Sequence, residues 1–359
     1  MPKGGEGGDR QGELAALRAL SARIGSDPLL TQGAGGNTSL KTDGTLWIKA
    51  SGTWLAHAAE RDIMVPVEIA PLVEAVARAD PAAEQAHRFM AAGGSAPDLR
   101  PSIETSLHAL LPQRVVLHVH CVDAIAFAVR TDCRAELEPR LDGLNWVLVP
   151  YARPGLPLAL AVARHLECRP DVLVLANHGL IVVADTVTAA AALLDEVKAR
   201  LRTAPRTAPE AAREKLPERA GGAGYRMPAS DAAHAVATDA ASTAIAGRGS
   251  LYPDHVVFLG PGSVVARPGE DAAAVVARLG FAPAMMLFPG EGVLMRADAT
   301  PGAEAMARCL ADVTARIPAD APLRVLSEEE HAQLIGWDAE KYRQDIARKA
   351  AVTAGARAG

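Results

Sequence analysis

The chain has 359 residues, of which 49% are hydrophobic and 22% charged, and its formal net charge at pH 7 is −5. This length indicates two domains, or one large domain with an appendage, and the apolar content is ample for packed cores. A mildly acidic chain has no bulk electrostatic attraction to nucleic acid or to anionic membranes, so neither is an expected partner.

Cysteine spacing and hydropathy exclude further classes. The four cysteines show no CxxC spacing, which argues against a disulfide framework and against a cysteine zinc site. Free thiols fit a reducing compartment, so a cytoplasmic protein is expected. The glycine-rich N-terminus lacks the apolar run of a signal peptide, and no stretch reaches the roughly 18 apolar residues of a membrane span.

The first elements in chain order are a helix and a hairpin. Residues 1–10 are expected to be disordered, and a helix is predicted over 11–24 from its apolar spacing. Within 31–52, Asp43 and Gly44 separate two strand-like segments, and Asp-Gly is a strong signal of a β-hairpin turn. The remaining patterns predict helices over 67–90, 101–112, 160–167 and 186–201, and strands over 115–120 and 172–185, the last interrupted by an Asn-His-Gly turn.

The composition changes after the last of these helices. Residues 203–224 mix proline, alanine, charge and glycine, which predicts a linker that is helical in part. A first domain is therefore expected over 11–202 and a second over 225–345, followed by a frayed tail over 346–359.

The second domain shows an internal similarity to the first. Residues 289–308 match 176–195 without gaps, and 251–261 match 110–120. We interpret these matches as a degenerate duplication whose second copy has lost the histidines of the first. Chance similarity in an alanine-rich chain is the alternative.

Three histidines form the clearest chemical pattern. In a strand, alternate side chains share a face, so His118 and His120 project together. His178 adds a third candidate, in the turn after an apolar strand. Three nitrogen ligands with an open coordination position are typical of catalytic zinc sites, although Mn²⁺ or another divalent ion is possible. The alternative is that each ring only bonds a backbone carbonyl.

Two further residues lie in the predicted helix before the histidine strand. Glu104 is either a fourth ligand or general base near the metal, or a solvated carboxylate at a helix N-terminus. His108 lies four residues later on the same helical face, either near the site or packed among leucines.

Two loops offer groups for a polar ligand. The segment GAGGNT, 33–38, matches neither GxGxxG nor the P-loop, but exposes backbone N–H groups and Asn37, suited to an anion or a sugar hydroxyl. A plain structural turn explains it equally well. Lys49 and Ser51 add a cation and a hydroxyl, although Lys49 is equally compatible with a solvated strand residue.

Six motifs occur together in one order: GGNTS, KASG, PSIE followed by LHALLP, HVH, PYARPG and NHG. In this set the chain resembles the class II aldolase/adducin family, which includes the fuculose-, rhamnulose- and ribulose-phosphate enzymes, over roughly residues 12–202. The C-terminal half contains LYPDHVVFLGPG and WDAEKYRQ, and in these motifs it is similar to a long two-domain subgroup related to the aldolase half of bifunctional rhamnulose-phosphate aldolase/dehydrogenases.

The resemblance implies an α/β fold with three αβα layers around a largely antiparallel sheet, and a homo-oligomer, by resemblance a tetramer, with active sites between subunits. It implies that His118, His120 and His178 are metal ligands, and that Glu104 is the catalytic carboxylate and a resting-state ligand. The positions that it implies for a substrate phosphate pocket are Gly36, Asn37, Ser51, Gly52 and Ser102.

Two positions depart from the family pattern. Ile103 stands where a second small hydroxyl residue often precedes the glutamate, which weakens the phosphate assignment. The sugar-phosphate aldolases take a proton-donor tyrosine from the neighbouring subunit. Tyr151, in PYARPG, is the candidate here, although it does not align with that donor.

The predicted function is a metal-dependent aldolase that cleaves a sugar or sugar phosphate by a retro-aldol reaction through a metal-stabilised enediolate. Glu104 is the predicted acid/base group, and the loops within 33–52 are predicted to bind the distal end of the substrate. One alternative is a pentulose-phosphate-type 4-epimerase with the same site. The other is a non-catalytic, adducin-like scaffold, which the retained histidines disfavour.

Overall fold

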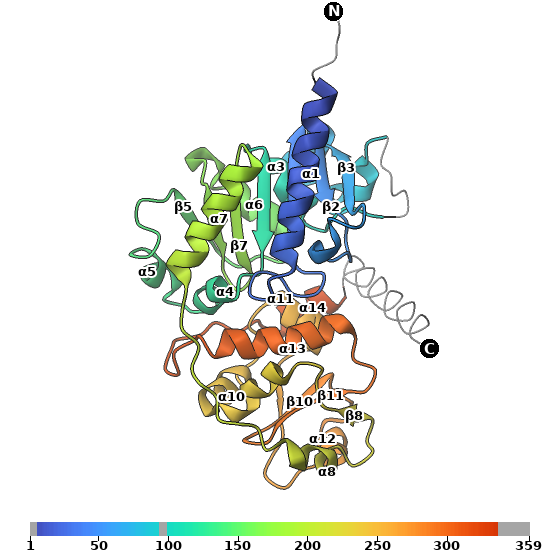
Figure 1. Ribbon diagram of the computed structural model, residues 1–359, viewed down its shortest axis with the longest axis vertical. Coiled ribbons are helices and arrows are strands. Elements are labelled where there is room, and N and C mark those ends of the chain that lie inside the picture. The colour runs from blue at the N-terminus through green and yellow to red at the C-terminus, as the bar shows by residue number, and fades with distance from the viewer. Residues whose placement is uncertain (1–5, 93–98, 337–359) are drawn as a thin grey trace, which may run out of the picture. The chain divides into compact units, whose positions relative to one another are not determined.

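The computed structural model describes residues 6–92 and 99–336, and these form two compact units (Figure 1). The first unit comprises the chain up to Cys121 together with Leu137–Leu201. The second comprises Val122–Glu136 and the chain from Arg202 onwards. The expected tail, 346–359, lies outside the described residues.

The first unit is built on a seven-stranded sheet of order β3-β2-β1-β4-β7-β6-β5. All neighbours in it are antiparallel except the parallel pair β5 and β6. The strands are β1 Asn37–Thr42, β2 Thr45–Lys49, β3 Met64–Glu68, β4 Val115–Val119, β5 Trp146–Val149, β6 Val172–Leu175 and β7 Gly179–Ala184.

Helices cover both faces of this sheet. Helices α1 (Glu6–Gly25) and α7 (Val187–Leu201) lie side by side over β1, β4 and β7 (Figure 1). On the other face, α2 (Ile69–Ala77), α3 (Thr105–Leu110) and α6 (Leu156–Ala163) share one core with the strands. The predicted three-layer αβα class with a largely antiparallel sheet is therefore confirmed. Short 3₁₀ helices complete the unit: η1 Leu55–His57, η2 Pro81–Glu84, η3 Ala86–Phe89 and η4 Leu166–Cys168.

Several local predictions for this unit are confirmed. Asp43 and Gly44 have φ of 51° and 75° and join β1 to β2, as the hairpin signal indicated. The strand at β4, the β6–β7 hairpin and α7 also form as predicted. The helix predicted over 101–112 is shorter, and that predicted over 67–90 begins only at Ile69 and ends at Ala77. The first helix begins at Glu6, inside the segment expected to be disordered.

The second unit has a four-stranded sheet of order β8-β11-β10-β9. Its strands are β8 Tyr225–Arg226, β9 Val264–Val265, β10 Met285–Phe288 and β11 Gly292–Arg296. Its helices are α4 Val122–Ala128, α5 Cys133–Leu137 (which ends at the first residue of the other unit), η5 Arg213–Lys215, α8 Leu216–Ala220, η6 Asp231–His234, α9 Ala235–Thr238, α10 Ala240–Ala246, α11 Pro253–Leu259, α12 Ala272–Leu279, α13 Pro301–Thr314 and α14 Glu328–Ile335.

The two sheets share an order of strand pairs. In each, a parallel pair is followed by an antiparallel hairpin and then by another antiparallel neighbour: β5, β6, β7 and β4 in one, and β9, β10, β11 and β8 in the other. The 176–195 and 289–308 segments correspond here, since each runs through a hairpin turn and a strand into a helix. The 110–120 and 251–261 segments do not, because one contains β4 and the other contains α11. The duplication as a whole stays a prediction.

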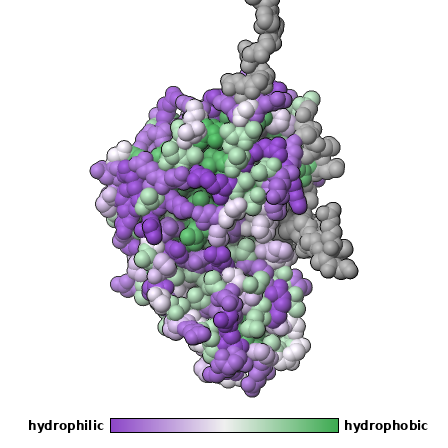
Figure 2. Space-filling view, in the orientation of Figure 1, coloured by the Kyte–Doolittle hydropathy of each residue, from purple (hydrophilic) through white to green (hydrophobic). Residues whose placement is uncertain are grey.

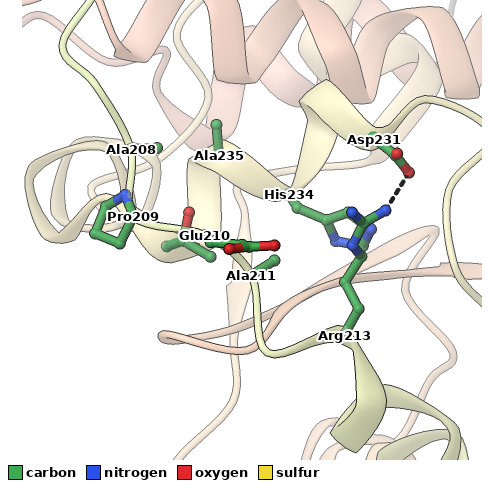
Figure 3. A pocket seen from close by; sticks show the side chains of 9 residues that line it. Ala208, Pro209, Glu210, Ala211, Arg213, Asp231, His234 and Ala235 are labelled. Carbon is green, nitrogen blue, oxygen red and sulfur yellow. Dashed lines mark ion pairs between the residues drawn. The ribbon is translucent and has the colours of Figure 1, made fainter.

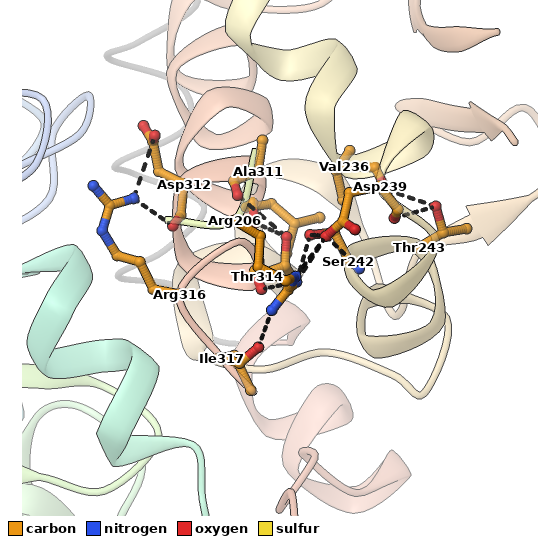
Figure 4. A network of polar contacts seen from close by, with 11 residues as sticks. Arg206, Val236, Asp239, Ser242, Thr243, Ala311, Asp312, Thr314, Arg316 and Ile317 are labelled. Carbon is orange, nitrogen blue, oxygen red and sulfur yellow. Dashed lines mark hydrogen bonds and ion pairs between the residues drawn. The ribbon is translucent and has the colours of Figure 1, made fainter. Parts of the chain in front are cut away.

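The first part of the predicted linker has no regular secondary structure, but Arg206 attaches it to the second unit (Figure 4). The guanidinium donates to Asp239 Oδ2 at 2.8 and 2.9 Å and to Ser242 Oγ at 3.0 Å, both at the start of α10. It also donates to the carbonyls of Thr314 and Ile317, at the end of α13. One side chain thus ties three segments together.

Replacing Arg206 by alanine is expected to destabilise the second unit. Loss of hydrogen bonds to a largely buried carboxylate costs about 1.5–3 kcal/mol, and this loss would lower the denaturant midpoint of unfolding. Arg296→Ala is the control, because Arg296 pairs with Asp298 at an exposed position and such pairs contribute about 0–1 kcal/mol. Equal midpoints for the two variants would contradict this role for Arg206.

Hydrophilic residues predominate on the face where α1 and α7 lie, with apolar residues in smaller groups between them (Figure 2). Among the described residues, no helix combines the length and the apolar character that crossing a membrane requires.

Candidate metal centre

Three histidine rings converge at one end of the central strands of the first sheet. His118 lies on β4, His120 directly follows that strand, and His178 lies in the turn between β6 and β7. The ring centroids are 4.9–5.2 Å apart, and one potential ligand atom from each ring lies within 4.8 Å of the others. All three side chains are buried, so the rings form a compact, water-poor cluster.

Strand alternation explains why the rings face Glu104. Val116 belongs to the core shared with α3, and His118, two residues later, projects from the same face. The Nδ1 atom of His118 lies 3.2 Å from the carbonyl oxygen of Leu180 on β7. With Nδ1–H donating to that carbonyl, Nε2 carries the free lone pair, which is the tautomer that a metal ligand requires.

The donor atoms have spacing that suits a cation. His118 Nε2 and His120 Nε2 are 3.2 Å apart. Two ligands at about 2.0–2.1 Å from one ion in tetrahedral geometry would be roughly 3.3 Å apart. His118 and His120 therefore have the spacing of two ligands of one divalent ion, and His178 completes a triad that could bind a metal.

Glu104 supplies the carboxylate of this cluster from the residue directly before α3. Its Oε2 is 3.3 Å from His118 Nε2 and its Oε1 is 3.5 Å from His178 Nε2. Burial opposes ionisation, but the nearby histidines and the Asn37 amide outweigh it and lower the pKa of Glu104 to about 2. Oε1 has no hydrogen-bond partner among the described residues, as expected of an atom that awaits a cation or a substrate proton.

Asn37 positions that carboxylate. It is the cross-strand partner of His118, on β1, and its Nδ2 donates to Glu104 Oε2 at 2.8 Å and to Ser102 Oγ at 3.1 Å. Sequence reasoning placed Asn37 and Ser102 only beside the substrate and missed their contact with Glu104. Only the pairing of β1 with β4 would have indicated it.

Lys49 and Gly36 shape the glycine loop. The Lys49 side chain is buried, and its Nζ donates to the carbonyls of Ala34 and Gly36 at 2.8 and 2.9 Å. Gly36 has φ of +68°, and a Cβ there would lie 2.9 Å from the carbonyl oxygen of His118. The loop thus packs directly on the histidine strand, and Lys49 is a structural cation within it.

Backbone hydrogen bonds join the second predicted loop, residues 49–52, to the segment just before Glu104. Ser51 N donates to the carbonyl of Arg100 at 2.8 Å, and Ser102 N donates to that of Lys49 at 3.1 Å. Ser51 and Ser102 are both buried, and Gly52 follows with φ of +75°. The segments that carry Ser51 and Ser102 therefore lie side by side, and Ser102 contacts Asn37.

Two other candidate residues come from the segment after β5 and from α3. Tyr151 follows β5, the edge strand of the sheet, which β6 and β7 separate from β4. His108 is buried on α3 with its Nδ1 2.7 Å from Ser39 Oγ, and burial lowers its pKa well below the usual value. His108 is not one of the three histidines whose ligand atoms converge, although His118 and Glu104 are near enough to influence its pKa.

Gly179, directly after His178, permits the close packing of the rings. A Cβ there would lie 2.6 Å from the Val119 carbonyl oxygen and 3.4–3.5 Å from ring carbons of His118 and His120. Gly179→Ala is expected to displace the turn and to lower zinc affinity about 10–100-fold, as outer-shell changes do. Competition with a chromophoric chelator measures this. Gly12→Ala, on α1 with nothing within 4 Å of its Cβ, is the control; equal affinities would contradict the proposed packing role.

Three of the known proteins to which the chain is similar are a curated relative and two solved structures. An uncharacterised oxidoreductase, YuxG of Bacillus subtilis (strain 168), is 31% identical over 176 residues, covering 45% of this chain and 25% of the relative. The chain thus spans about a quarter of that relative's length. The N-terminal class II aldolase domain of a conserved Thermoplasma acidophilum protein is 28% identical with a TM-score of 0.45, covering 52% of this chain and 90% of the other. L-Fuculose-1-phosphate aldolase from Thermus thermophilus is 19% identical with a TM-score of 0.35, covering 52% and 92%.

A family model covers more of the chain. It describes the class II aldolase and adducin N-terminal domain and matches residues 16–204. The matched range includes the loops at 33–38 and 49–52, Glu104 and all three histidines. More than half of the chain is matched, and the chain belongs to the class II aldolase and adducin family.

Proposed function

We propose that the protein is a divalent-metal-dependent aldehyde-lyase that cleaves a sugar or sugar phosphate by a retro-aldol reaction. One observation carries this proposal: ligand atoms of three buried imidazoles lie within 4.8 Å of one another, and the carboxylate of Glu104 lies 3.3 and 3.5 Å from two of them. A scaffold has no need of such a cluster, because four buried ionisable groups without a bound ion are costly to retain.

The histidines and Glu104 have different proposed roles in catalysis. His118, His120 and His178 would hold a divalent cation, Zn²⁺ or Mn²⁺, which when bound would supply Lewis-acid stabilisation of the negative charge that carbon–carbon cleavage leaves on the substrate. Glu104 is ionised at the start, so it can accept a proton from the substrate through Oε1 and then return that proton to the substrate carbon. Asn37 holds Oε2 by a hydrogen bond, and Ser102 Oγ accepts from the same Asn37 amide, so that Glu104 acts from one position.

Substrate binding is proposed for the loops around Gly36, Ser51 and Gly52, whose backbone N–H groups suit a phosphate or a hydroxyl. Tyr151 is the proposed proton donor, and a homo-oligomer is proposed with it. The four cysteines are free thiols, which favours a reducing, cytoplasmic environment.

The test is release of free aldehyde by the purified full chain loaded with Zn²⁺ or Mn²⁺. Ketoses and ketose phosphates are supplied, and an NADH-dependent reductase reports the aldehyde. Aldehyde release that stops on chelation and returns with metal is expected. Formation of an epimer without free aldehyde would favour the 4-epimerase, and undiminished activity after complete metal removal would refute the role of the metal.

A further inference from the structure

The second unit contains a cavity of about 220 Å³ between the segment 208–213 and the helical segment 231–238 (Figure 3). All of its lining residues belong to that unit, so the cavity is separate from the histidine cluster of the first unit. Part of its wall comes from the predicted linker, which Arg206 attaches to α10 and α13.

His234 is the buried polar group of this cavity. Its side chain is 3% exposed, and its Nδ1 accepts a hydrogen bond of 3.0 Å from Val293 N. Burial and the neighbouring Arg213 lower the pKa of His234, so the ring is neutral and its remaining proton is on Nε2. Among the described residues, Nε2–H has no hydrogen-bond partner within the protein, and the ring lines the cavity (Figure 3).

A glycine makes this position of His234 possible. A Cβ on Gly292 would lie 2.5 Å from His234 Nδ1, so only glycine admits the ring there. Gly292 begins β11 after its hairpin turn, just as Gly179 begins β7 beside the metal histidines. In both units, therefore, a histidine ring lies against a glycine at the start of the second hairpin strand.

The other polar groups are of both signs. Arg213 forms an ion pair with Asp231 at 2.7 Å, and Glu210 adds a second carboxylate, while Thr238 contributes a hydroxyl. Pro209 and three alanines supply apolar surface. The two carboxylates outnumber the single guanidinium, so the cavity carries a net negative charge that disfavours anions.

We propose that this cavity binds a small, neutral, polyhydroxylated molecule, a monosaccharide or polyol. Such a ligand donates hydroxyl protons to carboxylates, accepts from the imidazole and guanidinium N–H groups, and packs its C–H surface on proline and alanine. The cavity is smaller than the roughly 300–1,000 Å³ of sites for drug-sized ligands, which fits a molecule of this size. The assignment does not depend on the aldolase reaction.

The histidine ring itself provides the readout. In ¹⁵N-labelled full-length protein, long-range ¹H–¹⁵N spectra resolve the ring nitrogens, and His234→Gln identifies the His234 signals. Saturable shifts of these signals are expected on titration with aldoses, ketoses and polyols, but not with acetate or inorganic phosphate. Shifts with the anions alone, or with none of these compounds, would overturn the proposal.

Variants separate this site from sugar binding elsewhere in the chain. Ala211→Leu fills the cavity without removing a polar group and should weaken binding by tenfold or more. Arg213→Ala should weaken it by about tenfold, the effect of one hydrogen bond to a charged group. Arg267→Ala, in a different surface hollow of the same unit, is the control. Equal affinity in all four proteins, wild type included, would place the ligand elsewhere and refute the assignment.

Discussion

Replacing His178 by alanine is expected to remove stoichiometric metal from the purified protein and to abolish the proposed activity. Only two imidazoles and Glu104 remain as ligands, so zinc affinity should fall by more than about 100-fold, beyond the effect of losing an outer-shell partner. Metal analysis after dialysis measures this directly. His178 lies in a hairpin turn rather than within a strand, so the fold should survive.

His165→Ala is the matched control, because His165 follows α6 and is not a member of the cluster. It should retain both metal and thermal stability. A His178→Ala protein that still carries one ion per chain would contradict the assignment of the three histidines, whatever its activity.

Replacing Glu104 by glutamine is expected to lower kcat by about 10²–10⁴-fold, the contribution of a positioned general acid or base. The amide preserves the shape of the side chain and an acceptor for Asn37, but it cannot take up a proton. The three histidines remain, so metal analysis should show a loaded protein. The comparison is made at saturating substrate in the aldehyde-release assay.

Glu74→Gln is the control, since Glu74 forms only an exposed ion pair with Arg78. An unchanged kcat in Glu104→Gln would contradict the acid/base role. Loss of metal together with activity would instead show that the carboxylate acts mainly as a ligand.

Local sequence patterns predicted much of the first unit. The apolar runs around β4, β6 and β7 and the Asp43-Gly44 turn are signals within short segments, and the structure confirms them. The helix predicted over 101–112 is shorter for a long-range reason. Pro101 pairs with Ala50 in an isolated bridge, which leaves Glu104 just ahead of the first helical turn.

Local patterns also predicted the three histidines of the site, but not the contacts between distant segments. Alternation along one strand placed His118 and His120 on one face, and the structure brings His178 to them. The roles of Asn37 and Lys49 could not be predicted from the sequence. Each role depends on a contact with a distant segment: Asn37 pairs with His118 on β4, and Lys49 donates to the carbonyl of Ala34. The order of strands in the second sheet likewise required coordinates, since Tyr225–Arg226 is too short to show a pattern.

The pairing of β4 has a consequence for how this chain tolerates insertions and deletions. His118 lies opposite Asn37 on one side and Ile181 on the other. Because side chains alternate, adding or deleting one residue in β4 before His118 would turn both histidines to the opposite face and would misalign the apolar residues at the same time. We therefore expect length changes to accumulate in the connecting turns, while the spacing between Val115 and His120 stays constant among relatives that retain the metal.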